Sequence, residues 1–343
     1  MEAKYRKIAA VLLILVCLAQ VPAAAAEPGG AAEAVRLVPV GEAIGIQVEA
    51  SGLLVVGLTE VQTAQGPASP AWEAGLRTGD LITAVGPVSV STAAQLRDAL
   101  SLAEGAVGVR FLRDGRQQQL SVSPALNQAG EPELGVWLRS GLSGIGTMTY
   151  YDPETGFYGA LGHAVSDAET GVVLPLKTGF IGNARLESIV RGQQGKPGEL
   201  KGGMGLEAPI GGVLRNTPQG VFGCVEKDGL GALGGEAVEI CPLREVRCGP
   251  AALLSDVDGT VRTYEAEITR IYHGQDGSRD LLLTVTDPAL LELTGGIVQG
   301  MSGSPILQDG RLVGAVTHVL VSDPTKGYCI GIERMLAAAA PAA

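Results

Sequence analysis

The sequence has few aromatic residues, 4% of 343, and only three histidines. Because glycine is costly inside helices, 50 glycines beside so few aromatics favour short strands and turns over a helical bundle. The chain also lacks an excess of basic residues, and its formal net charge is −11. Nucleic acid and anionic lipid headgroups both need basic patches, so neither is expected as the main partner.

Cysteine is sparse as well, and no CxxC spacing occurs among the five that are present. With the histidines scattered, this pattern gives no support for a zinc site, and no metal or other cofactor is predicted. A disulfide among Cys224, Cys241 and Cys248 remains open, because an exported protein can form one.

The chain has no long hydrophobic run. Its N-terminal apolar stretch, from Ile8 to Val21, falls short of the roughly 20 residues that a transmembrane helix needs. Lys4 and Arg6 precede the stretch, and small alanines at 24–26 follow it. This pattern predicts that residues 1–26 are an export signal peptide, with an uncleaved membrane anchor as the alternative. Residues 27–34 form a spacer rich in proline, glycine and alanine.

Residues 35–126 alternate short apolar runs with turns. The string Ala-Gly-Leu-Arg-Thr-Gly-Asp-Leu-Ile at 74–82 predicts the end of a short helix, a glycine cap and a turn into a strand. Residues 92–102 carry apolar positions at helical spacing, and a hairpin follows around Asp114-Gly115. This segment resembles a PDZ domain.

The PDZ resemblance implies a peptide-binding site. Ala43, Ile44, Gly45 and Ile46 would form the loop whose amides accept a peptide C-terminus, while the peptide itself adds as a strand. The alternative is a packing module that binds no free peptide. From residue 127 to residue 343 the chain is strand-rich with frequent glycines, which suggests a barrel or a double barrel.

The sharpest motif is Gly-Met-Ser-Gly-Ser-Pro at 300–305. Glycines on both sides of a serine allow a tight turn that exposes the hydroxyl. The motif resembles the nucleophile turn of trypsin-like peptidases. That resemblance implies Ser302 as nucleophile, with the amides of Gly300 and Ser302 as the oxyanion hole. Ser304 is the alternative nucleophile.

A serine hydroxyl needs a base, usually histidine. His163 lies among small residues that would let its ring sit at the edge of a cleft, and it is the predicted base. His318 lies on a predicted strand, where the role of a core histidine is favoured, and His273 lies in a predicted turn.

Three segments, 159–167, 296–305 and 314–324, resemble the stage IV sporulation protein B family of serine peptidases. The order of the segments matches too: a membrane-directing N-terminus, a PDZ domain and then a peptidase domain. The resemblance implies a mainly β protein with a chymotrypsin-like double β-barrel, acting as a secreted endopeptidase between the two forespore membranes. Its substrate would be a membrane-anchored regulator, whose cleavage releases an intramembrane protease that activates a sigma factor. Self-cleavage is also associated with the family.

The family pattern further implies Asp287, fifteen positions before Ser302, as the acid that orients the histidine. Asp287 followed by proline equally fits a helix N-cap, and Asp167, just after His163, is a rival for the orienting role. A competing function is a PDZ-based binding protein whose peptidase-like barrel is inactive.

Overall fold

The structure, a computed structural model, describes residues 35–205, 208–226, 234–272 and 279–340. The predicted signal or anchor at 1–26, the spacer and His273 lie outside the described residues. Within those residues no helix is both long and apolar enough to cross a membrane.

Antiparallel strands form a first closed barrel in the described chain. Its ring runs through β2 (Ala43–Leu58), β11 (Val136–Tyr151), β12 (Phe157–Ala160), β16 (Gly220–Val225), β15 (Gly211–Thr217) and β13 (Leu176–Val190). The ring closes because β2 pairs with β11 on one side and with β13 on the other. Its interior is a cluster of buried side chains that includes Val48, Met148 and Ile181.

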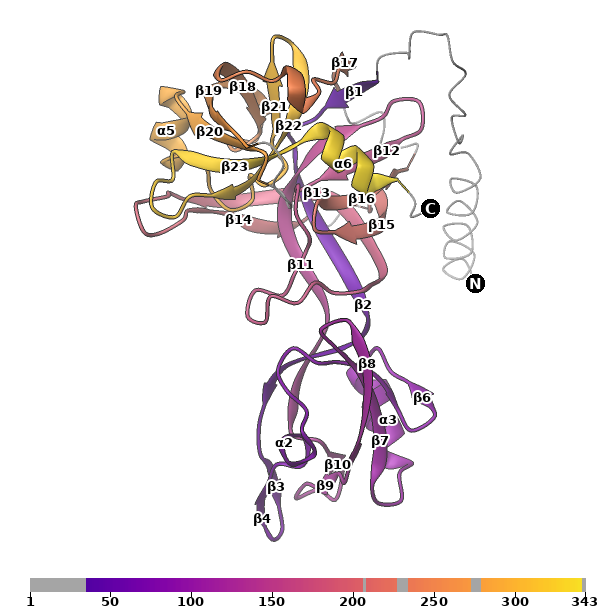
Figure 1. Cartoon of the computed structure of the whole chain (residues 1–343). Helices are drawn as coiled ribbons and strands as arrows, with labels where there is room; N and C mark the ends of the chain where they lie inside the picture. Colours follow the sequence, from indigo (N-terminus) through magenta and orange to yellow (C-terminus); the bar gives the residue numbers. More distant parts are fainter. Residues whose placement is uncertain (1–34, 206–207, 227–233, 273–278, 341–343) are drawn as a thin grey trace. The chain divides into compact units, whose positions relative to one another are not determined.

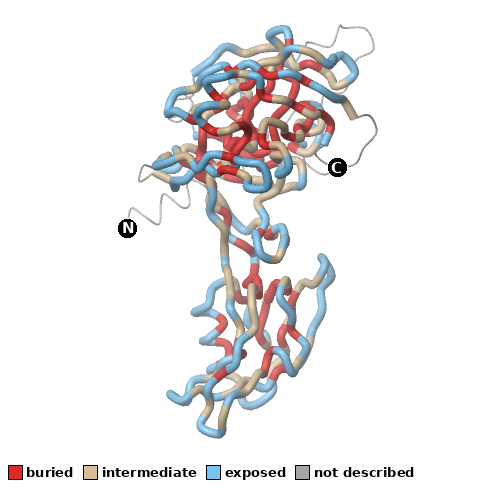
Figure 2. The backbone as a smooth tube through the Cα atoms, turned by 90° about the vertical axis from the view of Figure 1, so that its left-hand side faces the viewer, coloured by how far each residue is buried: buried red, intermediate tan, exposed pale blue. Residues whose placement is uncertain are grey.

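A second closed barrel, drawn in orange to yellow in Figure 1, follows in the chain. Its strands are β18 (Gly249–Ser255), β19 (Arg262–Ile271), β20 (Leu281–Val285), β23 (Lys326–Gly331), β22 (Arg311–Val319) and β21 (Pro305–Gln308). Leu253, Ile268 and Leu283 lie in its core. Figure 2 colours the backbone by burial, and buried stretches, in red, are concentrated in the part of the chain that forms the two barrels. The predicted mainly β fold with a double barrel is therefore confirmed.

Shorter elements surround the barrels. These are β1 (Arg36–Pro39), β14 (Glu199–Met204), β17 (Val238–Glu239), η1 (Leu243–Glu245), α5 (Pro288–Thr294) and α6 (Ile332–Ala339). The helix α6 buries Ile332 and Met335 in a cluster with Tyr150 and Phe222 of the first barrel and with Leu312 of the second. It therefore ties the two barrels together.

The PDZ-like module lies between β2 and β11. It comprises β3 (Val61–Thr63), β4 (Gly66–Ala68), α2 (Pro70–Ala74), β5 (Leu81–Val85), β6 (Val88–Ser89), α3 (Ala93–Ser101), β7 (Val107–Arg113), β8 (Arg116–Val122), β9 (Ala125–Leu126) and β10 (Pro132–Glu133). Gly75 ends α2 with φ 93°, as the sequence predicted, and Thr92 and Gln95 form a capping box at the start of α3.

The structure corrects the predicted boundary of this module. Residues 35–126 were expected to be a PDZ domain ahead of the peptidase domain, yet Val38 pairs with Tyr151 of the first barrel. The 16-residue strand β2 runs on without interruption from the barrel into the module. The module is thus inserted between the first two strands of the barrel. The apolar runs at 44–48 and 53–58 are separated by Glu-Ala-Ser-Gly at 49–52, yet the structure joins them in one strand, so this break did not mark the domain boundary.

The predicted carboxylate-binding loop is also corrected. Ala43, Ile44, Gly45 and Ile46 are buried in β2, with β11 paired on one side and β13 on the other. The amide of Ala43 donates to the carboxylate of Asp256 at 2.8 Å. Their main chain is enclosed by the barrel, so these four residues cannot receive a peptide.

The disulfide that the sequence left open is not formed. Cys241, Cys248 and Cys329 are free thiols, and Cys241 and Cys329 are buried.

Candidate active site

The turn before β21 has the form that the sequence motif predicts. Gly300 has φ 100° and Gly303 has φ 99°, a left-handed conformation that favours glycine. A Cβ on Gly303 would lie 2.0 Å from the carbonyl oxygen of Thr147 in β11, so the first barrel touches this turn directly. Gly303 also donates its amide to Val316 at 2.8 Å. Both barrels therefore hold the turn in place.

Strand β11 fixes the carbonyls on either side of the nucleophile. The hydroxyl of Thr147 donates to the carbonyl of Gly300 at 2.9 Å, and its amide donates to the carbonyl of Ser302 at 2.8 Å. Among the described residues no protein group accepts a hydrogen bond from the amides of Gly300 and Ser302. These are the two donors predicted for the oxyanion hole, and they remain available to a substrate carbonyl.

His163 follows β12 in the first barrel. Gly162, with φ 71°, brings the chain so close to the second barrel that a Cβ would lie 2.8 Å from the methyl of Thr317. The Nδ1 atom of His163 lies 2.8 Å from the carbonyl oxygen of Ala164. A carbonyl can only accept, so Nδ1 carries the proton and Nε2 is left with its lone pair. This is the tautomer that a general base requires.

Ser302 and His163 line one cavity of about 830 Å³. The structure thus brings together the predicted nucleophile, base and oxyanion donors. The hydroxyl of Ser302 donates to the carbonyl of Thr317 at 2.8 Å, and among the described residues it makes no bond to His163. Catalytic hydrogen bonds are often absent before substrate binds, and a rotation of the serine side chain would engage the base.

His318 is a site residue that the sequence did not predict. It was interpreted as a core histidine, but its ring is exposed in the cavity, 5.1 Å from the ring of His163. A register shift between Val316 and His318 in β22 turns the side chain outward, and no sequence signal marks such a bulge. Partial desolvation of the ring lowers the pKa of His318 to about 4, and the nearby His163 and Arg279 contribute to this shift by disfavouring a second positive charge. The ring is therefore neutral at neutral pH.

The structure does not bring Asp287 to His163, which corrects the predicted triad. One carboxylate oxygen accepts from the amides of Ala289 and Leu290 at 2.9 and 3.1 Å, as the N-cap of α5. The other accepts from the amide of Glu265 at 3.2 Å. Both oxygens of Asp287 thus accept hydrogen bonds from backbone amides, as expected of a helix cap.

Asp167, the rival, is also engaged elsewhere. Its buried carboxylate pairs with Arg139 and accepts from the amide and hydroxyl of Thr170 at 2.9 Å. These partners lower its pKa against the effect of burial. In place of a carboxylate, the carbonyl of Ala164 orients the ring of His163.

Comparison with known proteins agrees with this geometry. The family model described as SpoIVB peptidase S55 matches residues 130–336, more than half of the chain. The chain belongs to this family. It is a serine peptidase, and a PDZ domain model also matches residues 62–110.

Two solved structures resemble parts of this chain at low sequence identity. The Rv3671c protease from M. tuberculosis in its active form is 14% identical, over 57% of this chain and 72% of that chain, with a TM-score of 0.35. The PDZ domain of the SdrC-like protein from Listeria monocytogenes is 20% identical, over 26% of this chain and 87% of that chain, with a TM-score of 0.21. None of the curated proteins matches the sequence.

The nucleophile turn gives a first prediction. Gly303→Ala is expected to lower the free energy of unfolding by about 3 kcal/mol, because the new methyl meets the backbone of Thr147 and the left-handed φ is strained. Gly310→Ala is the matched control, since Gly310 has φ 75° but open space around its Cβ. It should cost about 1 kcal/mol. Urea denaturation measures both, and equal losses would show that the contact with Thr147 does not constrain the turn.

The N-cap of α5 gives a second testable prediction. Asp287→Ala is expected to destabilise the peptidase by about 1 kcal/mol, whereas Asp287→Asn should retain most of the stability, because asparagine also caps helices well. Thermal melting of the two variants measures the difference. A large fall in turnover of the asparagine variant, without loss of stability, would show that Asp287 reaches His163 in the working enzyme.

The pH dependence of kcat/KM gives a third testable prediction. Burial disfavours the charged ring and holds the pKa of His163 below its usual 6.5, although the Ala164 carbonyl opposes this in part. Since the base must be neutral, kcat/KM should stay level as the pH falls through 6.5 and decline only below it. By the same linkage the unfolded chain binds more protons, so folding stability falls as the pH drops below 6.5. A midpoint of the kcat/KM profile at or above 6.5 would contradict the buried, neutral ring.

Proposed function

We propose that this peptidase is an exported regulatory endopeptidase that cleaves a membrane-anchored regulator during sporulation signalling. Cleavage would release an intramembrane protease that activates a sigma factor. Membership of the SpoIVB family and the inserted PDZ module support the proposal, and the N-terminal sequence pattern supports export. The chain itself, cut near its N-terminal region, is a second expected substrate.

One observation carries the chemistry: Ser302, His163 and two amides that have no acceptor among the described residues meet in one cavity. Neutral His163 takes the proton of the Ser302 hydroxyl at Nε2 while the oxygen attacks the scissile carbonyl. The amides of Gly300 and Ser302 hold the oxyanion that develops. The protonated ring then gives its proton to the leaving amine. The Ala164 carbonyl keeps Nδ1 protonated throughout.

The experiment combines labelling with processing. A fluorophosphonate should label the wild-type peptidase and leave Ser302→Ala unlabelled. Purified peptidase should then cleave a membrane-anchored regulator of an intramembrane protease in vesicles, at a site outside the bilayer. Labelling without cleavage of any such regulator would keep the serine chemistry and reject the proposed pathway.

A binding role without turnover is the second candidate. The bond from Ser302 to the Thr317 carbonyl, together with the absence of a carboxylate partner for His163 in the described residues, favours it. Unlabelled wild-type protein that still binds the regulator would support this role.

A further inference from the structure

Two imidazole rings lie side by side in the catalytic cavity. His163 follows β12 in the first barrel, and His318 lies on β22 in the second. Both rings line the cavity, and their centroids are 5.1 Å apart with an angle of 40° between the ring planes. The fold therefore brings together two potential metal ligands that are far apart in the sequence.

Each ring has a nitrogen that can bind a metal ion. The Ala164 carbonyl keeps the proton of His163 on Nδ1, which leaves Nε2 with its lone pair. A histidine that ligates a metal usually donates its other ring N–H to such an oxygen. The ring of His318 is exposed, and among the described residues no protein group forms a hydrogen bond with it. Its lowered pKa, about 4, keeps it in the neutral form that binds metals.

The separation of the rings fits a tetrahedral ion between them. Zinc binds imidazole nitrogen at about 2.0–2.1 Å, so the ion would lie about 3.2 Å from each ring centroid. Two rings at the tetrahedral angle then have centroids about 5.2 Å apart, and the observed separation is 5.1 Å. His318 can turn about its Cβ–Cγ bond with its centroid nearly in place. The separation of the centroids therefore decides whether one ion can reach both rings.

We infer that His163 and His318 together bind a divalent transition-metal ion of the zinc type, which reversibly inhibits the peptidase. Imidazole suits such ions, whereas Mg²⁺ and Ca²⁺ take oxygen ligands. The ion would occupy the Nε2 lone pair with which His163 takes the proton of Ser302, so metal binding and proton transfer exclude each other. The inference adds a means of regulation to the proposed peptidase function, and its inhibitory part rests on that function.

Two protein ligands make this a weak site. Structural zinc sites have four protein ligands and catalytic sites have three. The described residues contain no group of three or more histidine, cysteine, aspartate or glutamate side chains that could hold a metal ion, so water would fill the other positions. Arg279, whose guanidinium lies over the ring of Tyr328, also disfavours added positive charge at His318. An ion bound here would therefore dissociate readily, as reversible inhibition requires.

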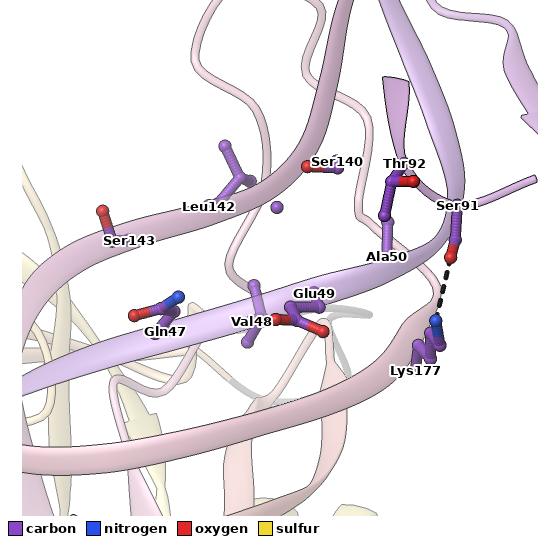
Figure 3. Close-up of a pocket in the computed structure, with 11 residues that line it drawn as sticks. Gln47, Val48, Glu49, Ala50, Ser91, Thr92, Ser140, Leu142, Ser143 and Lys177 are labelled. Carbon is purple, nitrogen blue, oxygen red and sulfur yellow. Dashed lines mark hydrogen bonds between the residues drawn. The ribbon is translucent and has the colours of Figure 1, made fainter. Parts of the chain in front are cut away.

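A second cavity offers no comparable site. It has a volume of about 330 Å³, and Figure 3 shows Gln47, Glu49 and Lys177 at its wall. Lys177 donates to the hydroxyl of Ser91 at 2.8 Å there. The described residues that line it include one carboxylate but neither histidine nor cysteine, a set that does not suit a transition-metal ion. Glu49→Gln is therefore a control for binding outside the catalytic cavity.

Calorimetry with ZnCl₂ on the full-length Ser302→Ala protein tests binding without turnover. His163→Ala and His318→Ala, each added to this background, should weaken zinc binding by about tenfold or more, because each removes one of two ligands. Glu49→Gln and Cys248→Ser, which removes an exposed thiol, should leave the affinity unchanged. MgCl₂ should not bind to the two histidines. Zinc binding that is equally tight in the His318→Ala protein overturns the site.

Thermal melting gives a second measure of binding. The two ligands come from different barrels, and the unfolded chain does not hold them together, so zinc should raise Tm. His318→Ala should abolish this rise, and its melt without zinc shows whether the variant folds. If it does not fold, His318→Gln replaces it, since a glutamine side chain is a poor zinc ligand. A rise in Tm that persists in the folded variant contradicts the bridging site.

Wild-type peptidase tests the inhibition. Zinc should lower kcat/KM for a peptide substrate and the rate of fluorophosphonate labelling in parallel, and EDTA should restore both. For His318→Ala, compared with its own rate without zinc, half-inhibition should need about tenfold more zinc or more. Equal zinc sensitivity of the wild type and the folded His318→Ala variant overturns the proposal.

Failure of the underlying function gives a different result. If Ser302→Ala binds zinc through the two histidines but the wild-type protein takes no fluorophosphonate label, the metal site is supported and the proposed catalysis is wrong. If the wild-type protein is labelled and cleaves peptides but zinc has no effect on either rate, only the inference of an inhibitory metal site is wrong.

Discussion

Ser302→Ala is expected to lower kcat by about 10⁴-fold or more on any peptide substrate while leaving the free energy of unfolding within about 1 kcal/mol of wild type. The substitution removes the nucleophilic oxygen, and the amides of the turn remain. The hydroxyl it deletes makes one hydrogen bond, to the carbonyl of Thr317. Single-turnover cleavage of a peptide substrate, with urea denaturation alongside, measures both quantities.

Ser304→Ala is the matched control for that loss. Ser304 is fully buried, and its hydroxyl has no hydrogen-bond partner in the described residues. It cannot reach a substrate, so its removal should change kcat less than about threefold. A large loss at Ser304 with activity retained at Ser302→Ala would reverse the assignment of the nucleophile, an alternative that the sequence left open.

The sequence predicted the parts of this site that lie in short local motifs. The glycines around Ser302 predict a tight turn, and the structure gives Gly300 and Gly303 the positive φ that such a turn uses. The small residues around His163 predict a ring at the edge of a cleft, and His163 lines the catalytic cavity. Glycine at such positions reports backbone conformation directly, so the prediction needed no tertiary information.

The prediction failed where tertiary structure decides between two local interpretations. Ala43 to Ile46 fit a peptide-binding loop by resemblance, but they are central residues of a barrel strand, because β2 continues across the module boundary. Asp287 fits both a helix cap and a catalytic acid, and the structure places its oxygens on backbone amides. The exposed position of the His318 side chain follows from a bulge in β22, which the sequence does not reveal. Each case depends on partners distant in sequence.

The inserted position of the PDZ module changes what its removal would do. An N-terminal domain could be deleted without touching the barrel. Here residues 43–49 of β2 pair with residues 141–147 of β11, and the module is the segment of chain that connects these two strands. Deletion must therefore join β2 to β11 by a short turn, or the first barrel loses a strand. Any test of PDZ function by truncation at residue 126 would remove β2 and unfold the site.

His163→Ala is expected to lower kcat/KM by about 10⁴-fold, second only to loss of the nucleophile, because the Ser302 hydroxyl is then left without a base. His318→Ala is the matched control: its ring shares the cavity, 5.1 Å from His163, but it is neutral, with a pKa of about 4, and no hydrogen bond joins it to Ser302 among the described residues. Its effect on kcat/KM should stay below about tenfold. The fluorophosphonate labelling rates of the two variants measure the same contrast without a substrate. If His318→Ala slowed labelling as much as His163→Ala, the assignment of the base to His163 alone would be wrong, and the two rings would have to act together.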